Sequence, residues 1–98
     1  MKTIYKYEIN AVDMVYIDMP KCAKVLTLQI QNGTPMIWAL VDNKNETEQR
    51  VFDIIGTGHS VPDLNGFRRE YINTFQLHGG SLVFHLFELV KERQKELV

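Results

Sequence analysis

Hydrophobic and polar residues alternate with a period of two along most of the chain, which is the pattern of β-strands and not of amphipathic helices. The predicted strands cover residues 3–9, 14–19, 25–31, 34–42, 50–55, 71–77 and 81–89. The last of these segments is apolar on both faces, as expected for a strand at the centre of a sheet. Charged, helix-forming residues then follow over residues 88–98. The pattern predicts one domain over residues 1–98, an all-β and mainly antiparallel sandwich or barrel that ends in a short C-terminal helix or tail.

The clearest element is a hairpin around Asn32-Gly33. This dipeptide lies between two alternating segments and favours a type I′ turn, in which both central residues have positive φ. A turn of this type places Leu26 opposite Ala39 and Lys24 opposite Val41. One face of the hairpin is then apolar and is assigned to the core: Leu26, Leu28, Ile30, Ile37, Ala39 and Val41.

Two residues of the second hairpin strand carry further information. Pro35 falls opposite Ile30, and its missing N–H predicts that the outer side of this strand is unpaired near the turn. Trp38 lies on the face opposite the aliphatic one, beside Met36 and Leu40. A large aromatic residue there is covered by a second layer, buried in a subunit interface, or a stacking surface for a flat ligand.

Composition excludes several classes of protein. The 98 residues contain 11 Lys+Arg and 12 Asp+Glu, a net charge of -1, so no cationic surface for coating a nucleic acid polymer is expected. The single cysteine, Cys22, cannot form an internal disulfide, which favours a reduced, cytoplasmic protein. The apolar stretches are shorter than the about 20 residues that a membrane helix needs, so no membrane association is expected.

The segment Gly56-Thr57-Gly58-His59 is the main candidate for ligand chemistry. Alternate glycines let backbone N–H groups approach an anion, while Thr57 and His59 add side-chain donors. The Arg68-Arg69 pair adds bidentate donors for phosphate, and Tyr71 or Trp38 offers a ring on which a base can stack. The alternative is structural, a strand that ends in a sharp turn because two glycines permit it, followed by a solvated arginine pair.

Other polar residues form no recognised catalytic or metal-binding pattern. His59, His78 and His85 lack the spacing of a zinc site, and no thiolate pair accompanies them. Asp53 has the parity of an outward or interface residue within an apolar strand. We therefore predict no catalytic residue, no metal and no cofactor. An enzyme that hydrolyses a phosphodiester with His59 and His85 remains a third hypothesis, which requires both rings to reach one substrate.

Several stretches together resemble a known family. They are Pro20-Lys21, Ala23-Lys24, residues 38–42, Gly56–His59, residues 74–76 and residues 83–88. Over residues 1–89 the chain resembles a domain-of-unknown-function family of short phage and prophage proteins. Cys22 and Asn73 stand where this resemblance leads us to expect glycine. The resemblance implies no activity; it implies a phage- or prophage-encoded cytoplasmic protein, and it gives added weight to Gly56–His59.

These observations lead to two main hypotheses. In the first, the chain is a non-enzymatic protein that sequesters a small phosphate-containing nucleotide, such as a host immune signal, at Gly56–His59. In the second, it is an interaction module that binds a host or phage protein through the Trp38 face. Strands that are apolar on both faces also predict a homo-oligomer, with any ligand site shared between copies.

Overall fold

The computed structural model describes residues 1–10 and 13–92, which form strands and one 3₁₀ turn. The strands are β1 (Lys2–Glu8), β2 (Met14–Pro20), β3 (Lys24–Gln31), β4 (Thr34–Asp42), β5 (Thr47–Gly56), β6 (Phe67–Leu77) and β7 (Leu82–Lys91). The 3₁₀ turn, His78–Gly80, joins β6 to β7. The predicted all-β fold is therefore confirmed.

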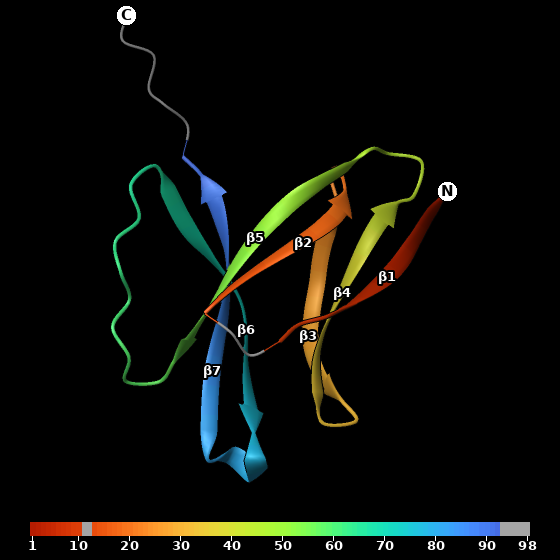
Figure 1. Cartoon of the computed structure of the whole chain (residues 1–98). Coiled ribbons are helices and arrows are strands. Elements are labelled where there is room, and N and C mark those ends of the chain that lie inside the picture. Colours follow the sequence, from red (N-terminus) through yellow and green to blue (C-terminus); the bar gives the residue numbers. More distant parts are fainter. Residues whose placement is uncertain (11–12, 93–98) are drawn as a thin grey trace, which may run out of the picture.

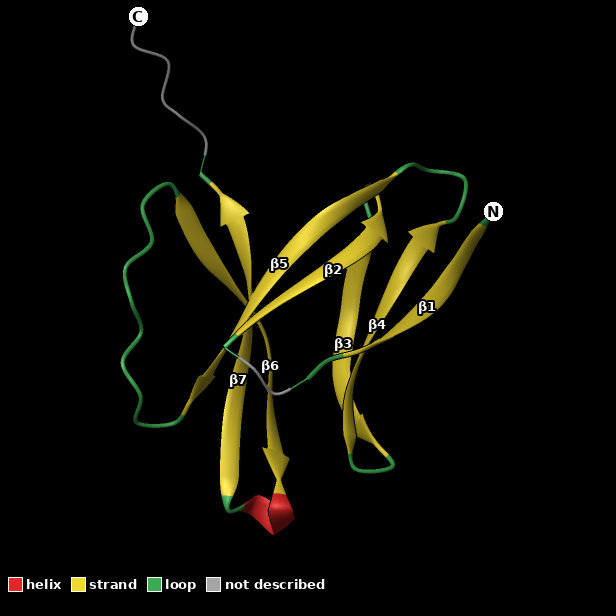
Figure 2. Cartoon of the chain, in the orientation of Figure 1, coloured by secondary structure: helices red, strands yellow, loops and turns green. Residues whose placement is uncertain are grey.

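Two antiparallel sheets pack against each other (Figures 1 and 2). Sheet A has the strand order β1-β4-β3, and sheet B has the order β2-β5-β7-β6. The two sheets meet along one pair of edges, where the Asn73 side-chain amide of β6 donates to the Leu28 carbonyl of β3 at 3.0 Å. On the other side, β1 and β2 are the outermost strands of their sheets.

The core lies between the sheets and is built from alternate residues of nearly every strand. Its fully buried side chains come from both sheets: Ile9, Met19, Leu28, Ile37, Val41, Phe52 and Leu86. Burying a large apolar side chain stabilises the fold by about 1.5–3 kcal/mol. At one end of the core this apolar packing gives way to an ion pair between Arg50 of β5 and Glu88 of β7.

The Asn32-Gly33 hairpin forms as predicted close to its turn. Asn32 has φ 51° and Gly33 has φ 80°, as a type I′ turn requires. Pro35 lies opposite Ile30. Further from the turn, however, the predicted register is wrong. A β-bulge between Val25 and Thr27 pairs Val25 with Ala39 and Lys24 with Leu40.

The bulge changes which side chains reach the core. Leu26, the extra residue, is 46% exposed, while Val25 packs against the buried cluster. Ile30 has the core-facing parity but lies next to the turn and is 39% exposed. Leu26 and Ile30 were therefore wrongly assigned to the core, because a bulge reverses the alternation that follows it and a turn-proximal residue extends past the packed interior.

The second strand of the hairpin is also more central than Pro35 suggested. β1 pairs with β4 from Asp42 to Met36, and the Ile9 N–H donates to the Pro35 carbonyl at 3.1 Å. The expectation of an unpaired outer side near the turn is thus wrong: the proline removes one donor, while its carbonyl still takes part in the pairing.

The last strand is central to its sheet, as predicted: β7 lies between β5 and β6. It also extends further than expected, since Glu88–Lys91 belong to this strand and not to a helix. Pairing of Glu88 with Phe52 and Glu70 on its two neighbours outweighs the helix propensity of the charged residues. The remainder of the predicted helix, residues 93–98, lies outside the described residues.

Candidate functional site

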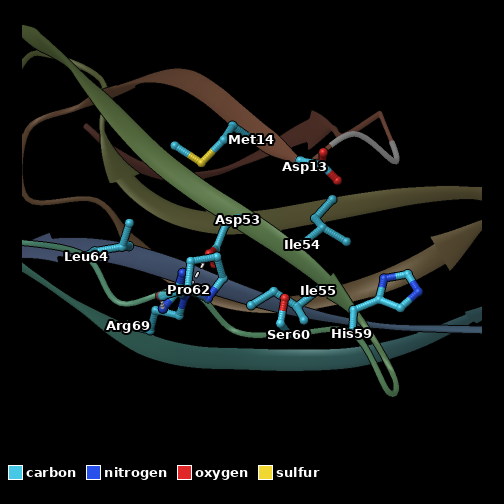
Figure 3. A pocket seen from close by; sticks show the side chains of 10 residues that line it. All are labelled: Asp13, Met14, Asp53, Ile54, Ile55, His59, Ser60, Pro62, Leu64 and Arg69. Atoms are coloured by element: carbon cyan, nitrogen blue, oxygen red, sulfur yellow. Dashed lines mark hydrogen bonds and ion pairs between the residues drawn. The ribbon is translucent and has the colours of Figure 1, made fainter.

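A cleft opens on the outer face of sheet B, where the 57–66 loop returns over β5. Its volume is about 320 Å³. Apolar walls alternate with polar groups around it (Figure 3), and the lining residues are Asp13, Met14, Asp53, Ile54, Ile55, His59, Ser60, Pro62, Leu64 and Arg69. Two of the residues selected from the sequence, His59 and Arg69, thus line one cleft.

An ion pair between Asp53 and Arg69 lies in the wall of this cleft. The Arg69 Nε donates to Asp53 Oδ2 at 2.7 Å, and its Nη1 donates to the Pro62 carbonyl at 2.6 Å. Asp53 is only 5% exposed, and its Oδ1 has no hydrogen-bond partner among the described residues. A buried carboxylate oxygen without a donor is costly, so a ligand N–H or O–H that reached it would be bound favourably.

The Gly56–His59 turn lies next to the cleft, but its own hydrogen bonds already use most of its donors. The Thr57 N–H donates to the Val83 carbonyl at 3.0 Å, and the His59 N–H donates to the Gly56 carbonyl at 3.0 Å. The His59 ring lies directly against Gly56, where a Cβ would meet Nδ1 at 2.9 Å. The turn therefore has the geometry of a tight strand end that positions His59, and it is a weaker phosphate cradle than its sequence indicated.

A hydrogen-bonded chain of side chains ties the start of this turn to β6 and β7. Thr57 Oγ1 lies 2.8 Å from His85 Nε2, and Thr74 Oγ1 lies 2.9 Å from His85 Nδ1. The Tyr71 hydroxyl continues the chain, 2.7 Å from Thr74 Oγ1. Thr57, Thr74 and His85 come from three of the stretches on which the family resemblance rests, which are Gly56–His59, residues 74–76 and residues 83–88.

One direction of donation satisfies every member of this network. The Thr57 hydroxyl donates to the Val83 carbonyl at 3.4 Å, so it accepts from His85 Nε2–H. His85 Nδ1 then accepts from Thr74, which accepts from Tyr71. Both ring nitrogens of His85 are engaged, which leaves neither one free to abstract a proton from a substrate in this arrangement.

The other residues selected from the sequence lie apart from the cleft. Trp38 is on the outer face of sheet A, across the core from the cleft, so one chain does not bring it to Gly56–His59. Arg68 pairs with Glu70 at 2.6 Å, on the opposite face of β6 from Arg69. Tyr71 is 61% exposed and packs edge-on against Phe87.

Sequence reasoning missed several residues of this region. Asp53 has the predicted outward parity, yet the 57–66 loop buries it. The signal available was a carboxylate inside an otherwise apolar strand, which requires a charged partner when covered. Thr74 had no signal beyond its place in the 74–76 stretch of the family resemblance. Asp13 and Met14 reach the cleft because β2 pairs with β5, which places Met14 opposite Asp53. Ser60 lines the cleft because it belongs to the 57–66 loop.

The described residues contain neither a three-residue metal-binding cluster nor a membrane-spanning helix. Within residues 1–10 and 13–92, no group of three or more His, Cys, Asp or Glu side chains is arranged to hold a metal ion. Over the same described part of the chain, no helix is long and apolar enough to cross a membrane.

Comparison with known families gives one match. A family model described as a domain of unknown function, DUF7352, covers residues 1–97. The chain belongs to this family. The match agrees with the resemblance to a domain-of-unknown-function family noted in the sequence. No curated protein and no solved structure matches the chain.

Proposed function

We propose that this member of the DUF7352 family is a non-enzymatic binding protein whose ligand is a small nucleotide, held in the cleft beneath the 57–66 loop. We further propose that it is phage- or prophage-encoded and acts in the host cytoplasm, where binding lowers the free concentration of a signalling nucleotide. The observation that carries the proposal is that one cleft is lined by His59, Arg69 and Asp53, and that Asp53 Oδ1 has no hydrogen-bond partner among the described residues.

The size and walls of the cleft suit a ligand of this class. A volume of about 320 Å³ lies at the lower end of the range for small-molecule sites, which combine apolar walls with a few placed polar groups. Met14, Ile55 and Leu64 supply apolar surface for a base or sugar. Arg69 is held at two points, so Asp53 is presented in a fixed orientation.

The polar groups also suggest an orientation. Asp53 Oδ1 is an acceptor that suits an amino or imino N–H of a base. His59 and Ser60 lie further along the cleft (Figure 3), where their side chains suit a phosphate oxygen. Asp13 and Asp53 give the cleft two formal negative charges, against one positive charge on Arg69. Because repulsion grows with the charge of the ligand, diester phosphates of one charge each are favoured over a polyphosphate chain.

Ligand-induced stabilisation tests this proposal. Wild-type protein is unfolded thermally with cyclic AMP, cyclic GMP, cyclic dinucleotides or ADP-ribose, each over a wide concentration range. A ligand at about 100 times its Kd is expected to add roughly 2.7 kcal/mol to the free energy of unfolding. Absence of a saturable shift with every compound would refute nucleotide binding.

Adjacent arginines supply matched controls. Arg69→Gln should abolish the shift, whereas Arg68→Gln, on the other face of β6, should leave it unchanged. Because Arg69→Gln also removes the Asp53 ion pair, Ser60→Trp provides a second variant that fills the cleft from an exposed position. If Ser60→Trp binds as tightly as wild type, the ligand lies elsewhere.

The Trp38 face supports a second candidate function, docking of a host or phage protein. Met36 and Trp38 are half-buried and Leu40 is exposed on this face, which no described element covers. Aromatic residues with an apolar surround are enriched among the residues that dominate binding energy at interfaces. A partner captured by wild type and lost with Trp38→Ala, while Ser60→Trp retains it, would favour this candidate over nucleotide binding.

A further inference from the structure

No strand among the described residues pairs with the outer edge of β1, and the hydrogen-bond pattern determines which backbone groups face it. The Ile9 N–H donates to Pro35, and the Asn43 N–H donates to Met1. In an antiparallel ladder, hydrogen-bonded pairs alternate along the strand, so odd-numbered residues of β1 bond to β4. The N–H and C=O groups that face the open edge therefore belong to Lys2, Ile4, Lys6 and Glu8.

We propose that a second copy of this chain pairs antiparallel with β1 along this edge, forming a continuous six-stranded sheet from the two copies of sheet A. The two-fold axis passes between the two Tyr5 residues. In this register Lys2 lies opposite Glu8 of the second copy, and Ile4 lies opposite its Lys6. All four edge-facing residues of each strand then exchange main-chain bonds, about eight in total.

Charge selects this register over its neighbours. A shift of two residues in one direction places Lys2 opposite Lys6, and a shift in the other places Lys6 opposite Lys6. Like charges directly opposite each other destabilise a strand pair, whereas opposite charges stabilise it. With Tyr5 on the axis, both copies gain a Lys2–Glu8 pair. The two Lys6 side chains lie only diagonally to each other, and each is drawn away toward Gln31, with Nζ 2.8 Å from Oε1.

The remaining edges of the sandwich are less suited to self-association. β3 and β6 meet each other through the Asn73–Leu28 hydrogen bond. On β2, the bonds from Ile54 to Asp13 and from Lys21 to Glu46 leave the even-numbered residues facing outward. These include Pro20, which has no N–H, and a single charge, Asp18, that has no opposite charge on the strand to pair with.

The exposure of β1 agrees with an uncovered edge. Ile4 is 55% exposed and Tyr5 is 39% exposed, although β1 is held firmly to β4 along its length. Figure 1 shows β1 as the outermost strand of its sheet, with β4 between it and β3. Pairing with a second copy would cover these two side chains and give the outward-facing N–H and C=O groups of β1 hydrogen-bond partners.

An orthogonal pair of charge variants tests both the interface and its register. Lys2→Glu alone places two carboxylates opposite each other at each end of the strand pair, and Glu8→Lys alone places two ammonium groups there. Sedimentation velocity should therefore show the dimer Kd rising about tenfold or more in each variant. Mixing the two variants restores both opposite-charge pairs, and a heterodimer should form near the wild-type Kd. Failure of the mixture to associate, with wild type dimeric, would overturn the proposal.

A backbone variant provides an independent readout. Ile4→Pro removes an N–H that faces the open edge and none that bonds to β4, so it should yield a folded monomer, whereas Ile4→Val should remain a dimer. Far-ultraviolet circular dichroism verifies folding. A wild type that is monomeric at all concentrations, or an Ile4→Pro chain that is folded and still dimeric, would show that β1 is not the interface. Neither outcome depends on nucleotide binding.

Discussion

Replacing Arg50 should reveal how much one largely buried arginine, paired with Glu88 within sheet B and bonded to the chain that enters β3, contributes to stability. Its guanidinium donates from Nε and Nη2 to the two oxygens of Glu88, the second at 2.8 Å, and from Nη1 to the Ala23 carbonyl at 2.7 Å. The side chains of Arg50 and Glu88 are 16% and 13% exposed. Hydrogen bonding to Glu88 raises the pKa of Arg50 above its ordinary value. One side chain thus joins β5, β7 and the entry to β3.

Arg50→Met keeps the aliphatic volume and removes these three bonds. The Glu88 carboxylate is then left largely buried without a countercharge, and the Ala23 carbonyl loses its donor. Removing one partner of a buried pair costs about 3–5 kcal/mol. Because this pair retains some contact with solvent, we expect a loss of about 3 kcal/mol. In a domain of this size each kcal/mol lowers Tm by roughly 4–8 °C, so the Tm should fall by more than about 10 °C.

Urea unfolding provides the assay, with the loss seen as a lower midpoint at unchanged m-value. The double variant Arg50→Met/Glu88→Leu should recover about half of the loss or more, since it leaves no buried charge unpaired. Arg68→Met is the matched control: its pair with Glu70 is exposed, and removing it should cost less than about 1 kcal/mol. A loss below about 1 kcal/mol for Arg50→Met, or no recovery in the double variant, would refute this reasoning.

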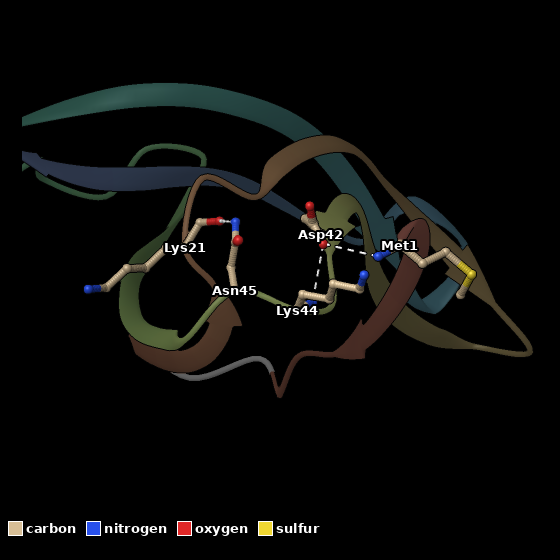
Figure 4. A network of polar contacts seen from close by, with 5 residues as sticks. All are labelled: Met1, Lys21, Asp42, Lys44 and Asn45. Carbon is tan, nitrogen blue, oxygen red and sulfur yellow. Dashed lines mark hydrogen bonds and ion pairs between the residues drawn. The ribbon is translucent and has the colours of Figure 1, made fainter.

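Three further predictions concern stability. Leu28→Ala, at a side chain 1% exposed between the sheets, should lower the free energy of unfolding by about 2–5 kcal/mol in urea titrations, and a loss under about 1 kcal/mol would contradict its place in the core. Cys22 has φ 66°, a left-handed conformation that favours glycine, so Cys22→Gly should raise the free energy of unfolding by up to about 1 kcal/mol, seen as a higher urea midpoint, whereas Cys22→Ala should not. Hydrogen bonds from the Lys44 N–H and then from the N-terminal ammonium lower the pKa of Asp42 (Figure 4). The ionised Asp42 side chain therefore stabilises the fold above the ordinary carboxyl pKa, and this stabilisation is lost as pH falls through the lowered folded pKa. Between neutral pH and about pH 3, Asp42→Asn should lose less free energy of unfolding than wild type does. Equal losses in the two proteins would contradict this prediction.

Local chemistry accounts for the features that could be predicted from the sequence. Strand positions follow from period-two alternation, because successive side chains of a strand point to opposite faces. The Asn32-Gly33 turn and the pairing closest to it follow from the positive φ that these two residues accept readily. The outward parity of Asp53 was predictable for the same reason. Each of these properties depends on residues that are neighbours in the chain.

Properties that depend on distant residues required the tertiary structure. Leu26 is exposed because a bulge reverses the alternation beyond it, and its sequence carries no glycine or proline to mark the position. Asp53 is buried because the 57–66 loop folds over it. His85 joins Thr57 and Thr74 because β7 lies between β5 and β6, a strand order that alternation does not encode.

The residues of the candidate site could likewise be selected from local sequence, whereas their positions relative to one another required the tertiary structure. From the sequence alone, Gly56–His59 and Trp38 were equally available for one ligand, since alternation specifies the face of a strand but not the sheet to which the strand belongs. The strand orders β1-β4-β3 and β2-β5-β7-β6 place Trp38 on one outer face and the cleft on the other. The sequence by itself determined the strands, a hairpin turn and the donors near Gly56. Only the tertiary structure decided which of them meet, because long-range strand pairing and loop packing bring together groups that no local pattern links.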